Sequence, residues 1–385
     1  MRRPILLCCF SVAAACSAGD DFKALYEGRQ WFQLRDTVQA AKAPALFYRA
    51  AVNCGLGDFE DASRDLRKVI EDAPRSWEAK EARTMLGNLS LLRGSWIDVR
   101  HLFLLNHIRQ SVEQRQPLKI HYTIKRGNLY VPVVINGKTV NHLLDTGASG
   151  PVVAESEAKW LGLKLYKVNQ TGTDGGTGRD FPIHYLGVAQ ELSLAGVTLR
   201  NVSFTVFPDD MPFFADIPQG ERGIIGLPVI LALEGMRWDT DGNFEAGSWP
   251  EPKDGAKSNL CFEECRVVAD VGYDGNRLIF GLDTGAVASG LYFRFRDQFP
   301  SLVSSSGTKT SLTDGGVTGN LGYDAIVLSQ LKLSVGGFET LLRPAPVSLQ
   351  TNVGSGHHGN LGLDLLNQAR SVMINFRSMR LTLSN

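Results

Sequence analysis

The chain has 385 residues, 43% of them hydrophobic, and its 40 lysines and arginines balance its 40 aspartates and glutamates. This length predicts two or three domains, and the apolar fraction is typical of a folded globular protein. The balanced charge and the lack of a long basic run argue against nucleic acid as a partner. Composition therefore excludes some classes of partner, but it indicates no particular chemistry.

The N-terminal sequence MRRPILLCCFSVAAACSAGD has two arginines, a short apolar stretch and then small residues. This order is typical of a secretory signal peptide, and the apolar stretch is too short to span a bilayer. We expect residues 1–18 to be removed on export, giving a periplasmic or secreted protein with no transmembrane segment in the mature chain. The alternative is a membrane-anchored lipoprotein modified at Cys16.

Residues 19–116 are predicted to be helical. In ALFYRAAVNCGLGDFEDASRDLRKVIEDAP, apolar residues recur every three or four positions around a Gly-Asp-Phe turn. Gly57, Phe59, Ala62 and Pro74 resemble the small, aromatic and terminating positions of a tetratricopeptide-type hairpin. Similar turns recur in EGRQWFQLRDTV and LRGSWIDVRHLF. Such hairpins either bind a partner protein or form a packed prodomain or spacer.

From residue 117 the periodicity becomes that of strands. LKIHYTI, LYVPVVI and KTVNHLLD alternate or run apolar, and Asn136-Gly137 predicts a tight hairpin turn. A polar stretch, AGSWPEPKDGAKSN, separates two strand-rich segments. We therefore predict β domains at residues 117–248 and 260–385, joined by a linker at 249–259.

The two strand-rich segments repeat one pattern. Each contains Leu-Asp-Thr-Gly-Ala, and its aspartate, Asp145 or Asp283, stands eight residues after the glycine of a predicted hairpin turn. The glycine-rich stretches TDGGTG and TDGGVTG follow. GIIGLPVI and GNLGLDLL come next, with Gly226 and Gly362 lying 81 and 79 residues after the aspartates. One Asp-Thr-Gly is common at a turn, but two with matched surroundings indicate an internal repeat.

This pattern resembles the aspartic peptidases. Hydrophobic-Asp-Thr-Gly-Ala is the retropepsin form of their catalytic loop, and an apolar-apolar-Gly element follows it, here IIG and NLG, where Asn360 replaces an aliphatic residue. The resemblance covers residues from about 117 to 385. It implies an all-β bilobal peptidase fold, with two retropepsin-like lobes fused in one chain about a pseudo-twofold axis. Together with the helical hairpins, this makes a multidomain protein, expected to be a monomer.

By this resemblance, Asp145 and Asp283 face each other within one molecule. Two carboxylates a hydrogen bond apart cannot both ionise cheaply, so they share one proton. The ionised member takes a proton from water while the protonated member donates to the carbonyl of a peptide bond. The titration belongs to the pair, so we assign neither residue a fixed role. This chemistry needs no metal and no cofactor.

Neighbouring residues are expected to support the two carboxylates. Gly147 and Gly285 let the backbone turn tightly and approach the carboxylates. By resemblance, Thr146 and Thr284 hydrogen-bond across the axis and hold the loops together. Ser149 is a weaker candidate, because Val287 occupies the matching position in the second repeat.

The glycine-rich stretches fall where mobile flaps over a cleft would lie. The residues concerned form two matched sets: Asp174, Gly175 and Gly176, and Asp314, Gly315 and Gly316. A cover of this kind would exclude water around a substrate. The alternative is an ordinary hairpin loop in each repeat.

The remaining candidates have structural explanations. We expect His142 to be a packed or edge residue, and His357 and His358 to lie in a solvated loop rather than line the cleft. In an oxidising compartment, Cys261 and Cys265 of CFEEC could form a disulfide; otherwise they are two nearby thiols.

The sequence thus predicts an exported aspartic endopeptidase whose cleft binds an extended peptide or protein substrate. The alternative function is a non-catalytic binding module that uses either the peptidase-like cleft or the helical hairpins.

Overall fold

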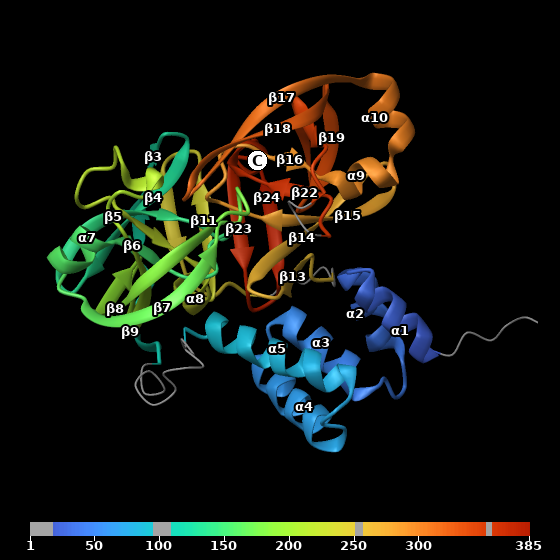
Figure 1. Ribbon diagram of the computed structural model, residues 1–385, viewed down its shortest axis with the longest axis horizontal. Coiled ribbons are helices and arrows are strands. Elements are labelled where there is room, and N and C mark those ends of the chain that lie inside the picture. Colours follow the sequence, from blue (N-terminus) through green and yellow to red (C-terminus); the bar gives the residue numbers. More distant parts are fainter. Residues whose placement is uncertain (1–17, 95–108, 251–256, 352–355) are drawn as a thin grey trace, which may run out of the picture.

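The computed structural model describes residues 18–94, 109–250, 257–351 and 356–385 (Figure 1). These ranges leave out residues 1–17 of the predicted signal peptide, most of the segment LRGSWIDVRHLF and most of the predicted linker. Among the described helices, none is long and apolar enough to cross a membrane.

The described part of the chain begins with a helical region of consecutive helices: α1 (Ala18–Glu27), α2 (Trp31–Ala40), α3 (Leu46–Leu56), α4 (Phe59–Asp72) and α5 (Trp77–Leu92). Gly57 ends α3 with a φ of +83°, a conformation that favours glycine, and so allows the short turn into α4. Ala62 of α4 is fully buried against its neighbours. Ser76 caps α5 by accepting a hydrogen bond from the Ala79 amide at 3.0 Å. The predicted helical hairpins are therefore present, while their likeness to tetratricopeptide repeats stays a prediction.

The β region that follows has three sheets within the described residues. We call residues 111–246 the first half and residues 260–384 the second half. The first sheet contains β1 (Ser111–Arg115), β3 (Thr123–Lys125), β4 (Asn128–Ile135), β5 (Lys138–Leu144), β6 (Val152–Ala154), β7 (Lys164–Thr173), β8 (Asp180–Leu194), β9 (Val197–Phe207) and β10 (Gly223–Ile225).

The second half forms a sheet of its own, coloured orange to red in Figure 1. Its strands are β13 (Leu260–Glu263), β14 (Arg266–Tyr273), β15 (Asn276–Leu282), β16 (Gly290–Leu291), β17 (Gly307–Gly316), β18 (Gly319–Leu328), β19 (Leu331–Val335), β20 (Phe338–Leu342), β21 (Ala345–Ser348) and β22 (Gly359–Leu361). Short helices accompany both halves: α7 (Glu155–Trp160), η1 (Pro212–Phe214), α8 (Leu227–Ala232), α9 (Phe293–Gln298), α10 (Pro300–Ser306) and α11 (Leu363–Leu366).

The strands around the two aspartates are arranged alike in both halves. The hairpin β4–β5 turns at Asn136-Gly137, and β14–β15 turns at Asp274-Gly275, all with positive φ. This is the two-residue turn that the sequence predicts. Strand β10 then lies between β5 and β6, and β22 lies between β15 and β16. Each central strand pairs in parallel with the strand that leads into the aspartate.

A third sheet joins the halves. It contains β2 (Lys119–His121), β11 (Gly235–Asp239), β12 (Asn243–Ala246), β23 (Ser371–Asn375) and β24 (Arg380–Ser384). Antiparallel pairing of β11 with β23 sets Met236 opposite Ile374 and Trp238 opposite Val372. The paired segments are MRWD, residues 236–239, and VMIN, residues 372–375, which begin ten residues after Gly226 and Gly362 respectively. Equivalent parts of the repeat therefore pair directly with each other. The largest apolar cluster runs through this sheet into both halves.

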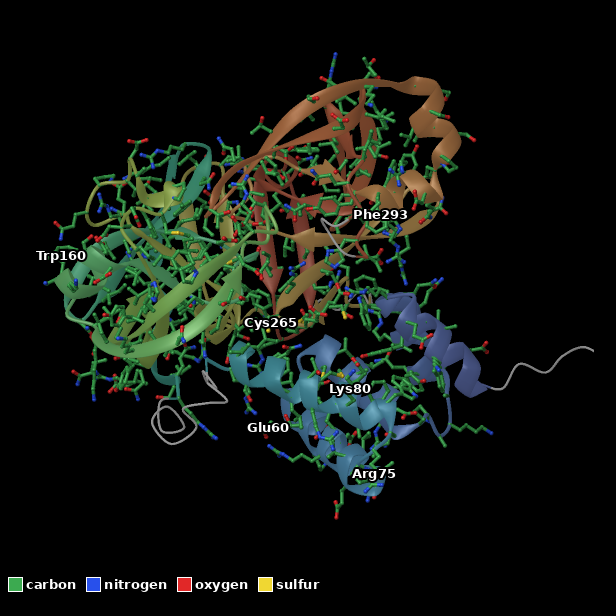
Figure 2. The ribbon with its side chains drawn as sticks, in the orientation of Figure 1. Glu60, Arg75, Lys80, Trp160, Cys265 and Phe293 are labelled. Atoms are coloured by element: carbon green, nitrogen blue, oxygen red, sulfur yellow. The ribbon has the colours of Figure 1, made fainter. Side chains whose placement is uncertain are left out.

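The helical region packs against the second half (Figures 1 and 2). Phe32 of α2 lies in an apolar cluster with Cys261, Val268 and Ile279. Phe59 of α4 lies 5.3 Å from Phe262, measured between ring centroids. Apolar burial on this scale fixes the helices to strand β13 and its neighbours.

A buried charged cluster completes this interface. Arg29 donates to Glu263 at 2.7 Å, and the other Glu263 oxygen is bonded to His357. Arg294 of α9 donates to the Gly28 carbonyl at 2.9 Å. Burial alone would raise the pKa of Glu263, but the hydrogen bond and charge of His357 and the charge of Arg29 outweigh burial and lower that pKa.

Two expectations from the sequence are wrong, and one question that it left open, the state of Cys261 and Cys265, has an answer in the structure. His357 and His358 do not lie in a solvated loop, since each is 3% exposed. Cys261 and Cys265 are free thiols, because Cys261 packs inward while Cys265 lies in the turn, where its Sγ contacts the Asn88 carbonyl at 3.8 Å. The β region begins before residue 117, because β1 pairs with β9.

We predict that Glu263→Gln lowers the free energy of unfolding by about 2–4 kcal/mol at pH 7, because it leaves Arg29 without its buried partner. Folding lowers the pKa of this carboxylate, so its contribution to stability is complete at pH values above the ordinary glutamate pKa of about 4.3. The contribution is lost as the pH falls through the lowered pKa. The difference between parent and variant should therefore shrink in acid. Urea unfolding at pH 7 and pH 3 measures it. Glu339→Gln, which removes an exposed carboxylate 4.0 Å from Lys332, is the matched control and should change little. An equal loss at both pH values would contradict the ion-pair explanation.

Candidate active site

Asp145 and Asp283 occupy equivalent positions, each directly after a buried strand, β5 or β15. The Oδ1 atom of Asp145 accepts hydrogen bonds from the amides of Gly147 at 2.7 Å and Ala148 at 3.1 Å. The Oδ1 atom of Asp283 accepts from Gly285 at 2.9 Å and from the following alanine amide at 3.1 Å. One oxygen of each carboxyl is thus held by its own loop, and the other remains for chemistry.

The two carboxyl groups lie against each other. A Cβ added to Gly147 would lie 2.6 Å from Cγ of Asp283, and one added to Gly285 would overlap Cγ of Asp145. Glycine is therefore required at both positions because the opposite carboxyl occupies the space of a side chain. Burial, the charge of Asp283 and a hydrogen bond between the two carboxyls raise the pKa of Asp145 well above its ordinary value, against the two loop amides.

Thr146 and Thr284 join the two loops by reciprocal hydrogen bonds. The Thr146 amide donates to Oγ1 of Thr284, and the Thr284 amide donates to Oγ1 of Thr146, both at 3.0 Å. Each hydroxyl donates in turn to a carbonyl of the opposite half, Leu282 or Leu144, at 2.8 Å. Both threonines are fully buried. All four bonds cross between the halves, so the loops are held in one geometry.

Two asparagines near the carboxylates were not singled out as site residues from the sequence. Asn128, at the start of β4, donates to the Gly285 carbonyl at 3.0 Å and so ties the first half to the second aspartate loop. Asn360 of β22 donates from Nδ2 to Oδ2 of Asp283 at 3.4 Å. Its replacement of an aliphatic residue in NLG was the only signal in the sequence.

The two glycine-rich stretches form the tips of two hairpins that meet each other. We call residues 174–179, between β7 and β8, the first tip. We call residues 314–319, which comprise the end of β17, the turn and the first residue of β18, the second tip. A Cβ at Gly176 would lie 2.6 Å from the Gly315 carbonyl oxygen, and one at Gly316 would overlap Asp174. The second tip also packs on the first half, because Phe213 donates to the Val317 carbonyl at 3.4 Å.

Asp174 is the centre of the contact between the tips, and it is only 4% exposed. Its Oδ2 accepts from the Thr318 amide at 2.8 Å, the Thr318 hydroxyl at 2.6 Å and the Thr177 hydroxyl at 2.9 Å. Its Oδ1 accepts from the Gly176 amide at 2.9 Å. Burial acts to raise the pKa of Asp174, but these donors, Thr318 first, lower it overall.

The second tip is electrostatically coupled to the paired aspartates. The pKa of Asp314 is raised by desolvation and by the charges of Asp283 and Asp174. The hydrogen bond from the Gly315 amide acts to lower this pKa but does not outweigh them. Burial and the charges of Asp283 and Asp314 also raise the pKa of Tyr292. Asp314 thus belongs to the surroundings of the two aspartates, whereas Asp174 holds the two tips together; a role of the tips as mobile flaps stays a prediction.

The other candidates lie outside this arrangement. His142 is fully buried, as expected of a packed residue, with its Nε2 3.7 Å from Glu157. Ser149, at the edge of the Asp145 loop, is exposed. No group of three or more acidic, histidine or cysteine side chains suited to a metal ion occurs among the described residues.

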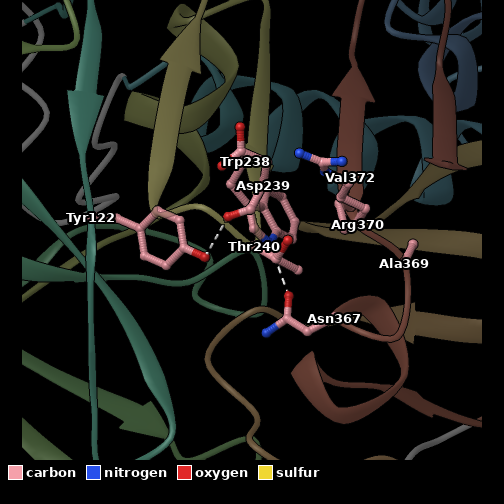
Figure 3. Close-up of a pocket in the computed structure, with 8 residues that line it drawn as sticks. All are labelled: Tyr122, Trp238, Asp239, Thr240, Asn367, Ala369, Arg370 and Val372. Atoms are coloured by element: carbon pink, nitrogen blue, oxygen red, sulfur yellow. Dashed lines mark hydrogen bonds between the residues drawn. The ribbon is translucent and has the colours of Figure 1, made fainter. Parts of the chain in front are cut away.

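A cavity of about 190 Å³ lies at the third sheet (Figure 3). The Tyr122 hydroxyl donates to the Asp239 carbonyl at 2.8 Å, and the Trp238 indole donates to Asn367 at 2.9 Å. Two pairs of the residues that line this cavity are thus bonded to each other. It lacks the paired carboxylates and is distinct from the candidate active site.

A family model described as aspartyl protease matches residues 131–229, which include Asp145 and end before Asp283. Among solved structures, the chain is similar to a retropepsin-like aspartic protease from Rickettsia conorii, with 17% sequence identity, a TM-score of 0.25, and coverage of 35% of this chain and 93% of that one. No curated protein matches the chain. The family match and the resemblance at the catalytic loop support an aspartic peptidase, which is a hydrolase.

We predict that Thr146→Val lowers the free energy of unfolding by about 2–4 kcal/mol, because it leaves the buried Thr284 amide and Leu282 carbonyl without partners. Thr146→Ser keeps the hydroxyl and should cost far less. Chemical denaturation of both variants and of Thr146→Val/Thr284→Val measures this. Losses that simply add in the double variant would contradict a reciprocal network.

We predict that Asp174→Asn loosens the contact between the tips and raises amide hydrogen exchange at residues 174–179 and 314–319 by about 10-fold or more at pH 7, since hydrogen bonds to a charged acceptor are lost. Because folding lowers the pKa of Asp174, its contribution is complete above the ordinary aspartate pKa of about 3.9 and is lost as the pH falls through the lowered value. Protection of the tips in the parent, corrected for intrinsic exchange, should decrease in that range.

Asp180→Asn is the control for this measurement, because Asp180 lies on the same hairpin but is exposed and accepts only from the Thr173 hydroxyl among the contacts described, at 2.7 Å. Unchanged protection of both tips in Asp174→Asn would show that the carboxylate does not hold them together.

Proposed function

We propose that the chain is an exported aspartic endopeptidase, in which two fused lobes related by a pseudo-twofold axis form one active site within a monomer. The observation that carries the proposal is the contact of the Asp145 and Asp283 carboxyls across the loops joined by Thr146 and Thr284. Export rests on the N-terminal sequence alone.

The geometry suits hydrolysis by an activated water. The backbone amides hold Oδ1 of both aspartates, so the carboxyls stay close together at a cost in mutual repulsion. The pKa of Asp145 is raised by burial and by Asp283, which favours one proton shared by the pair. A water between the carboxyls then loses a proton to the ionised member, while the other member protonates the peptide carbonyl oxygen.

The two hairpin tips are suited to cover a bound peptide. Their contact through Asp174 and Thr318 links hairpins from opposite halves, and Asp314 lies near enough to affect the paired aspartates electrostatically. A substrate in extended conformation would lie between the tips and the aspartates, with its backbone paired to strand edges. Entry of a folded or long substrate requires the tips to separate.

We predict that Asp145→Asn and Asp283→Asn each lower peptide cleavage by at least about 10²–10⁴-fold, because the general acid or base is lost. Cleavage of a diverse peptide library is measured from pH 2 to pH 8, and the parent should give a bell-shaped pH profile that reports the pair. Asp274→Asn is the matched control, since Asp274 is an exposed turn residue with φ of +46°, which asparagine also adopts.

Full activity in both active-site variants would refute the assignment of the pair. A parent that cleaves no peptide at any pH, but binds peptides from the library, would favour the non-catalytic binding module instead.

A further inference from the structure

The two catalytic loops are matched at nearly every position, but they differ on the strand beside each aspartate. Strand β10 pairs in parallel with β5, which sets Ile224 opposite Leu143; strand β22 pairs in parallel with β15, which sets Asn360 opposite Gly281. Leu143 and Gly281 stand two residues before their aspartates. Asn360 is therefore the counterpart of Ile224, and the first half has an apolar side chain where the second has an amide.

This amide contacts the carboxyl group directly. Asn360 Nδ2 donates to Oδ2 of Asp283 at 3.4 Å, on the oxygen that the loop amides leave unpaired. Asp145 accepts from its two loop amides, and Ile224 offers no donor to its other oxygen. An N–H donor bonds a carboxylate more strongly than a neutral carboxyl, so it favours the ionised form.

The other groups near Asp283 do not favour its ionised form. Asp145 faces it from the opposite loop, Asp314 approaches from the second tip, and Tyr292 lies before α9. Asp145 and Asp314 are acidic and offer Asp283 no N–H donor, and the loop amides bond both aspartates at similar distances, 2.7 and 3.1 Å for Asp145 and 2.9 and 3.1 Å for Asp283. Among the described contacts, Asn360 is therefore the donor that distinguishes Asp283 from Asp145.

The strand that carries Asn360 is held at its other end. His358 Nδ1 accepts from the Ile279 amide at 3.0 Å, and His357 is bonded to buried Glu263. The amide is thus fixed in place before any substrate binds, as a positioning residue requires.

We propose that Asn360 makes the pair asymmetric, so that in the free protein Asp283 is the ionised member and Asp145 carries the shared proton. This inference rests on the proposed peptidase function and assigns the roles that the repeat leaves open.

Each aspartate then has one role in each step of the reaction. The water oxygen bonds to the carbonyl carbon as the carbonyl π bond breaks; the water proton passes to Asp283, and the proton of Asp145 passes to the carbonyl oxygen. In the second step Asp283 gives its proton to the amide nitrogen and the C–N bond breaks. One hydroxyl of the tetrahedral intermediate returns a proton to Asp145, which restores the starting state.

The test is the pH dependence of kcat/KM for a cleaved library peptide in the parent and in Asn360→Leu, which removes the amide at similar size. The acidic limb should move up by about 0.5–1 pH unit, which lowers kcat/KM about 3–10-fold below that limb. Ile224→Leu, a change at the matching position without an amide, should leave the limb in place. A uniform loss at all pH values, or an unmoved acidic limb, would overturn the proposal while leaving the peptidase function standing.

A second measurement does not depend on cleavage. Carbon-13 NMR of the aspartate carboxyls of the parent, assigned with Asp145→Asn and Asp283→Asn, follows which carboxyl ionises in the lower step. Ionisation of Asp283 first supports the proposal even if the parent cleaves no peptide, and ionisation of Asp145 first overturns it. In Asn360→Ile/Ile224→Asn, which exchanges the two side chains, the order should reverse; an unchanged order would also overturn it.

Discussion

The reciprocal hydrogen bonds of Thr146 and Thr284 are the interaction on which the site depends. Each hydroxyl both accepts from and donates to the opposite half, and the carbonyls that receive these donors belong to Leu144 and Leu282, immediately before the aspartates. The position of each carboxyl is therefore set by the backbone of the opposite half. Because both threonines are fully buried, water cannot replace these bonds cheaply. Two loops more than a hundred residues apart thus meet in one arrangement.

The parts of the structure that could be predicted from the sequence are those that depend on local, repeated chemistry. Asn136-Gly137 and Asp274-Gly275 adopt the positive φ values of two-residue turns, which few residue types tolerate. The repeat then located both aspartates and their threonines, because each half contains the full motif. The contact between the two halves could be predicted only from the resemblance to the aspartic peptidases, because no local pattern indicates which loops face each other.

The remaining features depend on partners far away in the chain. The sequence around His357 indicates a loop residue. In the structure, His357 is buried and bonded to Glu263, which also accepts from Arg29 in another part of the protein. Asp174 lies in an ordinary turn sequence, and its donors on Thr318 come from the other half. Strand β1, SVEQR, is exposed along its length and so has no apolar alternation to reveal it.

The helical region contacts the two halves unequally. Arg29 and Phe32 reach the second half, where Glu263 connects them through His357 to the strand that carries Asn360. We therefore interpret the helices as a support for the second aspartate loop. Removal of this support would expose the apolar face of β13 and leave the buried charge of Glu263 without Arg29.

The unequal support is consistent with the reaction itself. Hydrolysis of a peptide bond needs one acid and one base at any moment, whereas two identical lobes would offer two equal carboxyls. In a symmetric homodimer, the two carboxyls become different only when a substrate binds or when one of them takes the shared proton. In a fused chain each half can differ permanently, as Asn360 and Ile224 do, and as Asp174 and Asp314 do at the two tips. Under the proposed function, the chain keeps the repeat where both halves hold a carboxyl and departs from it where the two carboxyls act differently.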